Sequence, residues 1–67
     1  MHIAYDVKAD ALYIKLKEGE FHTNRQVEPG IVLDIGQNND LLGIEILDAS
    51  THLDLAQILP VEFATSV

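Results

Sequence analysis

The chain has 67 residues, no cysteine and a formal net charge of −7, with eleven Asp and Glu against four Lys and Arg. Disulfides and cysteine-based zinc sites are therefore excluded, and an acidic surface repels phosphate backbones and anionic membranes. We expect no binding to nucleic acid or to membranes. A basic protein is the partner that this charge favours.

The size of the chain predicts one small domain, residues 1–67. A chain of this length buries only about 60% of the surface that its unfolded form exposes, so we expect oligomerisation to supplement a thin core. The first residues lack the basic region and apolar run of a secretion signal, and no apolar stretch is long enough to span a membrane. We therefore expect a cytoplasmic protein.

Alternation of apolar and polar residues predicts four to five β-strands. They cover residues 2–6, 11–17, 21–27, 31–36 and 41–47. The third is so polar that we expect it at a sheet edge. Glu28-Pro29-Gly30 predicts a type II turn before the fourth strand, because Pro presets φ and Gly accepts positive φ. The short connections cannot form parallel crossovers, so the strands form an antiparallel β-meander.

One face of this sheet carries large apolar side chains and needs a covering layer. We expect a C-terminal helix over residues 50–59, packed on that face, which makes the fold class α+β. Asp48, Ser50 and Thr51 can each cap it, Thr51 and Asp54 resemble a capping box, and Pro60 ends or kinks it. Residues 61–67 fit either a turn that folds Phe63 back or an arm that reaches a neighbouring subunit. The predicted core face consists of Ile3, Tyr5, Leu12, Ile14, Leu16, Ile31, Leu33, Ile35, Leu42, Ile44 and Ile46.

Three segments carry a family resemblance: Tyr5-Asp6-x-x-Ala9-Asp10-Ala11-Leu12-Tyr13-Ile14, Gly30-Ile31-Val32-Leu33-Asp34 and Gly43-Ile44-Glu45-Ile46-Leu47-Asp48-Ala49-Ser50. Together they closely resemble the small prokaryotic family called domain of unknown function 2283 (DUF2283). The resemblance implies a compact β-sheet module with a C-terminal helix and no established activity. It also associates the chain with a small toxin-like protein as its partner.

Two carboxylates, Asp6 and Asp10, flank the first predicted turn between Tyr5 and Tyr13. Such groups can bind a cation, but carboxylates in turns more often accept backbone N–H bonds. An EF-hand loop would need more oxygen ligands at regular spacing and a terminal Glu. We therefore expect Asp6 and Asp10 to fix the turn.

Asp48 and His52 are four residues apart and share a face if both are helical. They are weak candidates for a metal site, with His22 or His2 as a third ligand. Two groups do not make a site, so we favour Asp48 as a helix cap and His52 as an exposed residue.

Asp34 and Glu45 point outward on neighbouring predicted strands and suggest a carboxylate pair for acid–base hydrolysis. Tyr13, Lys15 and Arg25 on the same surface can neutralise this pair, which favours a polar sheet face instead. Neither a catalytic residue nor a cofactor site emerges from the sequence.

We therefore expect an uncharacterised, non-catalytic protein-interaction module. The alternative is a small metal-binding protein or hydrolase with a site at a subunit interface. A homodimer is the expected assembly, because apolar residues remain after the core face is filled. These are Tyr13, Val32, Leu41 and Leu47 on the sheet and Val61, Phe63 and Val67 in the tail. The edge strand and the tail are the two candidate contacts.

Overall fold

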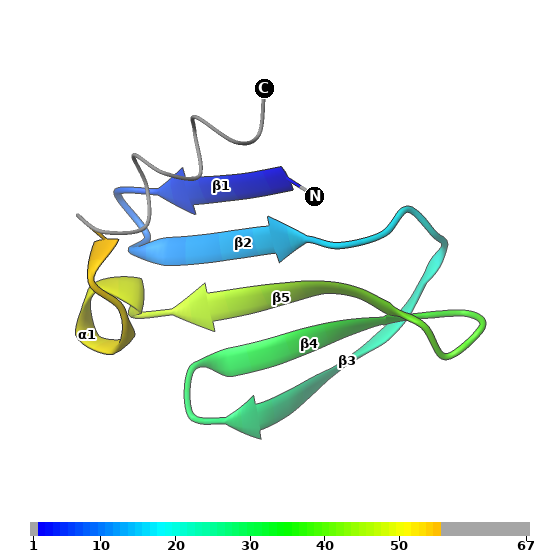
Figure 1. Ribbon diagram of the computed structural model, residues 1–67. Coiled ribbons are helices and arrows are strands. Elements are labelled where there is room, and N and C mark those ends of the chain that lie inside the picture. The colour runs from blue at the N-terminus through cyan, green and yellow to red at the C-terminus, as the bar shows by residue number, and fades with distance from the viewer. Residues whose placement is uncertain (1, 56–67) are drawn as a thin grey trace.

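The computed structural model describes residues 2–55, which form a five-stranded antiparallel sheet with one short helix (Figure 1). The strands are β1 (His2–Asp6), β2 (Ala11–Lys15), β3 (Phe21–Glu28), β4 (Ile31–Gly36) and β5 (Leu41–Leu47), and the helix is α1 (Ala49–His52). The predicted antiparallel sheet is confirmed, although strands dominate so strongly that α+β is a loose description. None of the described residues belongs to a helix long and apolar enough to cross a membrane.

The strand order is β1-β2-β5-β4-β3, so the sheet is sequential only in part. β3, β4 and β5 form the predicted meander, whereas β2 pairs with β5 rather than with β3. Figure 1 shows the connection after β2 passing the ends of the central strands to reach the far edge. The polar strand β3 occupies that edge, as its composition predicts.

The register of the strands separates two faces, since directly opposed residues share a face. On the apolar face, Leu12 lies opposite Ile46, which lies opposite Ile31, and Ile14, Ile44 and Leu33 form the next row. On the other face, Tyr13 lies opposite Glu45, and Glu45 lies opposite Val32. We call this second side the polar face.

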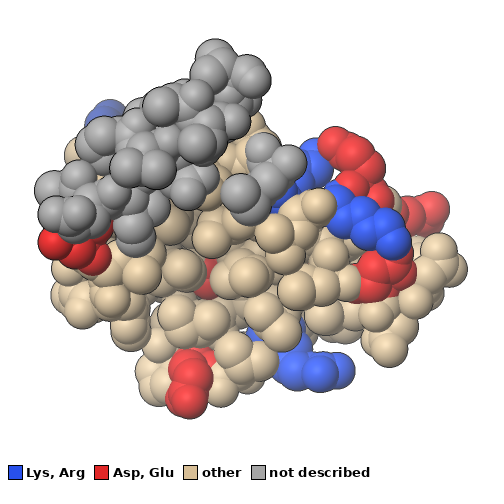
Figure 2. All heavy atoms as spheres, in the orientation of Figure 1, with Lys and Arg blue, Asp and Glu red and all other residues tan. Residues whose placement is uncertain are grey.

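The core forms where α1 meets the apolar face. Leu12 is 2% exposed, Ile46 is 9% exposed and Ala49 of α1 is fully buried. Leu53 and Leu55 pack against the same cluster. In the view of Figure 2, uncharged side chains fill the centre of the molecule's surface and charged ones gather toward its margins. The apolar rows of the sheet therefore meet the covering segment predicted from the sequence.

The helix is shorter than predicted. α1 ends at His52, and Leu53 is extended, with φ −129° and ψ 151°, so the continuous helix expected over residues 50–59 is wrong. Thr51 lies inside α1, where its Oγ1 donates to the Asp48 carbonyl at 2.7 Å, and the predicted capping box does not form. Residues 56–67, with the predicted end of the helix and the tail, lie outside the described residues.

β2 ends two residues before its predicted end. The Leu42 carbonyl accepts the N–H groups of both Leu16, at 2.8 Å, and Lys17, at 3.1 Å. One carbonyl thus faces two successive residues, which breaks the alternation. Leu16 is 40% exposed as a result, and its assignment to the core is wrong.

Gly43 in β5 permits close packing on the polar face. A Cβ atom there would lie 2.5 Å from the Tyr13 hydroxyl oxygen, 2.8 Å from Tyr13 Cζ and 2.9 Å from the Ile14 carbonyl oxygen. Real Cβ atoms do not approach other atoms so closely. The Tyr13 side chain therefore lies across a strand position that only glycine can occupy.

We predict that Gly43→Ala destabilises the protein by about 1–3 kcal/mol, the usual cost of overpacking. Urea unfolding followed by circular dichroism measures the loss. Gly19→Ala is the matched control, because its closest contact would be the flexible end of the Leu42 side chain. An equal loss in both variants would show that the Tyr13 contact does not constrain position 43.

Candidate functional site

Asp6 fixes the first hairpin turn. Its Oδ1 accepts the backbone N–H groups of Lys8, at 3.0 Å, and Ala9, at 3.1 Å. This is the turn-fixing role predicted from the sequence, and it is typical of Asp in short turns.

Asp10 connects the turn to α1. It has a left-handed backbone, with φ 52°, which Asp tolerates better than most residues. Its carboxylate accepts the Tyr5 hydroxyl at 2.7 Å, the Ser50 hydroxyl at 2.6 Å and the Ser50 N–H at 3.1 Å. Its carbonyl accepts the Ala49 N–H at 2.8 Å. Asp10 therefore binds the start of a helix that lies 40 residues along the chain.

These hydrogen bonds change the titration of both partners. They hold the pKa of Asp10 below its ordinary value, with the Ser50 hydroxyl as the largest cause and the Tyr5 hydroxyl next. The same bond to Asp10 raises the pKa of Tyr5. The charged carboxylate is thus the form that the fold stabilises.

Asp48 does not act as the side-chain cap predicted for it. It occupies the N-cap position with φ 50°, but its side chain makes no capping hydrogen bond. Ser50 was predicted as a cap, yet it donates to Asp10 instead. A carboxylate distant in sequence therefore takes the capping role.

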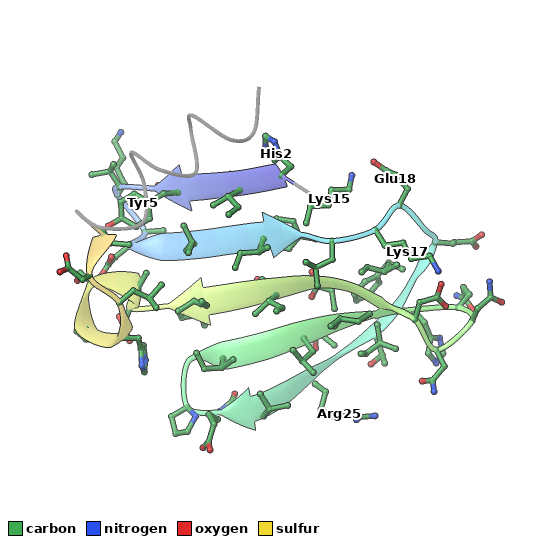
Figure 3. All side chains as sticks on the ribbon, viewed as in Figure 1. His2, Tyr5, Lys15, Lys17, Glu18 and Arg25 are labelled. Atoms are coloured by element: carbon green, nitrogen blue, oxygen red, sulfur yellow. The ribbon has the colours of Figure 1, made fainter. Side chains whose placement is uncertain are left out.

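The three histidines occupy separate parts of the fold. His2 is on β1 and His22 is on β3, at opposite edges, and His2 is labelled at the β1 edge in Figure 3. His52 lies against the β3–β4 turn, where a Cβ on Gly30 would be 3.0 Å from its Nε2. Within residues 2–55, no three His, Asp or Glu side chains gather closely enough to hold a metal ion. Asp48, His52 and His22 therefore form no three-ligand group there.

The carboxylates predicted to neighbour each other do so on the polar face. Asp34 lies opposite Gly43, and Glu45 is two residues along β5 on the same side. Tyr13 lies opposite Glu45, and its hydroxyl reaches over Gly43. Arg25 does not share this surface, because it lies opposite Leu33 of the apolar face. The prediction that Arg25 neutralises the pair is wrong.

The closeness of the two carboxyls raises pKa values on this face. Hydrogen bonding to Asp34 is the largest cause that raises the pKa of Glu45, followed by burial and by the Asp34 charge. Burial, followed by the Asp34 charge, raises the pKa of Tyr13. We name Tyr13, Asp34 and Glu45 the carboxyl cluster.

Two contacts described above, the approach of Tyr13 to Gly43 and the hydrogen bond between Asp10 and Ser50, are hard to predict from the sequence. A glycine inside an alternating strand indicates a close approach, but the sequence does not say that Tyr13 makes it. The bond between Asp10 and Ser50 had no local signal, because the two residues are far apart along the chain.

The edge strand β3 is the most open element among the described residues. All eight of its residues are exposed, including Phe21 at 54% and Val27 at 46%. Its register with β4 is irregular near both ends, which leaves Thr23 to Gln26 as its regular part. No pocket is enclosed by the described part of the chain. Among the described residues, β3 therefore presents an exposed strand edge.

Comparison with known protein families matches residues 2–50 to a family described as "Protein of unknown function (DUF2283)". The matched region runs from β1 into α1, so it contains the whole sheet, Asp10, Ser50 and the carboxyl cluster. The chain belongs to the DUF2283 family. The family resemblance seen in the sequence is confirmed.

One curated relative is similar to this DUF2283 protein, a "Putative hypoxanthine phosphoribosyltransferase" from Methanosarcina mazei. It is 34% identical over 53 residues, which are 79% of this chain and 42% of that protein. The chain thus spans less than half of that relative, and the printed name describes the longer protein. No solved structure matches the chain significantly.

We predict that Asp10→Asn removes a pH-dependent part of the stability. The lowered pKa of Asp10 means that its contribution is complete above the ordinary value of 3.8 and is lost as the pH falls through the folded-state pKa. Asn retains a tolerance for the left-handed backbone but carries no charge.

Thermal unfolding at a series of pH values tests this prediction. At neutral pH the variant melts at a lower temperature than the wild type, and the difference shrinks in acid. Asp54→Asn, at an exposed site beyond α1, should follow the wild type. A difference between Asp10→Asn and the wild type that stays constant with pH would contradict the charged role of Asp10.

Proposed function

We propose that this DUF2283 protein is a non-catalytic protein-interaction module that works as a homodimer and binds a basic protein. The observation that carries the proposal is the open β3 edge, with eight exposed residues, on a described chain that encloses no pocket. Catalysis on small molecules usually needs a concave site, whereas a free strand edge offers backbone groups to another chain.

The charge of the protein supports the choice of partner. The excess of acidic residues gives a net charge of −7, which attracts a basic surface and accelerates encounter with it. β3 itself has few acids, since Glu28 is its only Asp or Glu. Such a strand can approach another chain with little local repulsion. The family resemblance adds a small toxin-like protein as the partner to test first.

Exposed apolar side chains support self-association. Phe21 and Val27 on β3 and Leu41 and Leu47 on β5 are each more than one-third exposed. A small chain without disulfides gains stability when a second copy covers such residues. A two-fold contact would cover the same residues on both copies.

We predict that Phe21→Lys/Val27→Lys weakens both the dimer and capture of the partner, because Lys on an edge strand discourages strand addition. Val7→Lys is the matched control, since Val7 is 77% exposed in the β1–β2 turn. Circular dichroism confirms that each variant folds.

Two separate measurements read the result. Light scattering after gel filtration at micromolar concentration gives the mass, and we expect twice the 7.4 kDa of one chain. Tagged protein recovered from its native host, with mass spectrometry of what it retains, identifies the partner. A 7.4 kDa monomer would refute the dimer, and no reproducible partner across growth conditions would refute the interaction module.

A further inference from the structure

The carboxyl cluster brings two acidic side chains and one phenol to a single point of the polar face. Asp34 extends from β4 opposite Gly43, Glu45 extends from β5 two residues away, and Tyr13 reaches across from β2. The absent side chain of Gly43 leaves the space into which the Tyr13 hydroxyl extends. Three strands therefore direct polar atoms toward the same position.

Two carboxyls that neighbour each other on adjacent strands cannot both be charged at low cost. Like charges at close range disfavour double ionisation, so one carboxyl retains its proton to a higher pH. A hydrogen bond between the two groups also requires that proton, because two carboxylates contain acceptors only. Asp34, Glu45 and Tyr13 are all only partly exposed, so water screens their charges less than at a fully open site.

Other charged groups on this face do not replace the proton. Lys15 on β2 is the nearest cation along the strands, and its Nζ lies 2.8 Å from Glu18. His2 and Asp6 lie on β1, two strands from Glu45. On β3 the residues opposite Asp34 and Val32 are Asn24 and Gln26, which carry no charge.

We propose that Asp34 and Glu45 hold one proton between them beside the Tyr13 hydroxyl, and that its release loosens the pairing of β4 with β5. This proton-dependent clasp goes beyond the interaction module and does not rest on it. Among the described strands, β4 and β3 pair with the rest of the sheet only through β5. Loosening the clasp therefore frees the β3–β4 hairpin before the β1–β2 hairpin.

The sign of the pH effect follows from the Glu45 carboxyl. Its pKa is raised above the ordinary value of 4.5, so the proton-dependent stability is complete below pH 4.5 and is lost as the pH rises through the folded-state pKa. Asp10 acts in the opposite direction and below its ordinary value of 3.8. The two effects therefore occupy different pH windows.

The first test is carbon-13 NMR of the wild-type side-chain carboxyls. We expect the Glu45 carboxyl to titrate above its ordinary pKa of 4.5, because the nearby Asp34 carboxyl favours its protonated form. A Glu45 carboxyl that titrates at or below 4.5 would overturn the proposal. This measurement needs no variant to fold.

The second test compares urea unfolding of the wild type with Glu45→Gln across the window above pH 4.5. A side-chain amide keeps donor and acceptor atoms but cannot ionise. The wild-type unfolding constant should rise by up to about tenfold per pH unit between the unfolded-state pKa and the folded-state pKa of Glu45. The variant should lack this rise. Glu20→Gln, in the exposed connection before β3, is the matched control and should follow the wild type.

Amide hydrogen exchange locates the loosening. As the pH rises through the window, protection corrected for the intrinsic pH dependence of exchange should fall first in β4 and β5 and later in β1 and β2. Equal loss in all strands, or the same pH profile in Glu45→Gln and the wild type, would refute a clasp between β4 and β5.

Discussion

Pairing along β5 is the constraint on which the rest of the sheet depends. β5 joins the β1–β2 hairpin to the β3–β4 hairpin, and both neighbours pair with it in antiparallel register. The two faces of β5 make different contacts. Leu42 and Ile46 are buried, while Gly43 and Glu45 face Tyr13 and Asp34. A substitution in β5 can therefore alter the packing on both faces of the sheet.

Two polar contacts join segments that the strand pairing leaves separate. Asp10 binds the first turn of α1 through Ser50, and so fixes the helix beside the apolar face. The carboxyl cluster joins β2, β5 and β4 on the opposite face. Hydrogen-bond donors lower the pKa of Asp10, whereas the neighbouring Asp34 carboxyl and burial raise the pKa of Glu45. Different neighbours thus shift the pKa values of two chemically similar groups in opposite directions.

The sequence predicts the strands well because period-two alternation is a local property. The positions of β1, β4 and β5 follow from it. The edge location of β3 follows from its polarity instead, and the closeness of Asp34 to Glu45 follows from the short turn that makes their strands neighbours. Strand order does not follow from alternation, since alternation says which face a residue takes but not which strand lies beside it. α1 ends at His52, Leu53 packs against the core, and Asp10 binds the start of the helix. Tertiary contacts of this kind have no local signal and can override helix propensity. Arg25 was misplaced because counting along β3 cannot fix its register with β4.

The strand order also has a consequence for how the chain acquires its structure. During synthesis, β1 to β4 emerge before β5, and at that stage they can form only two separate hairpins with no shared partner. An isolated two-stranded hairpin is marginally stable in water. The last strand then inserts between them and closes contacts across most of the sequence, a topology that folds more slowly than one built from local contacts. The ribosome-bound nascent chain would thus expose both inner strand edges until the fifth strand is free to join them.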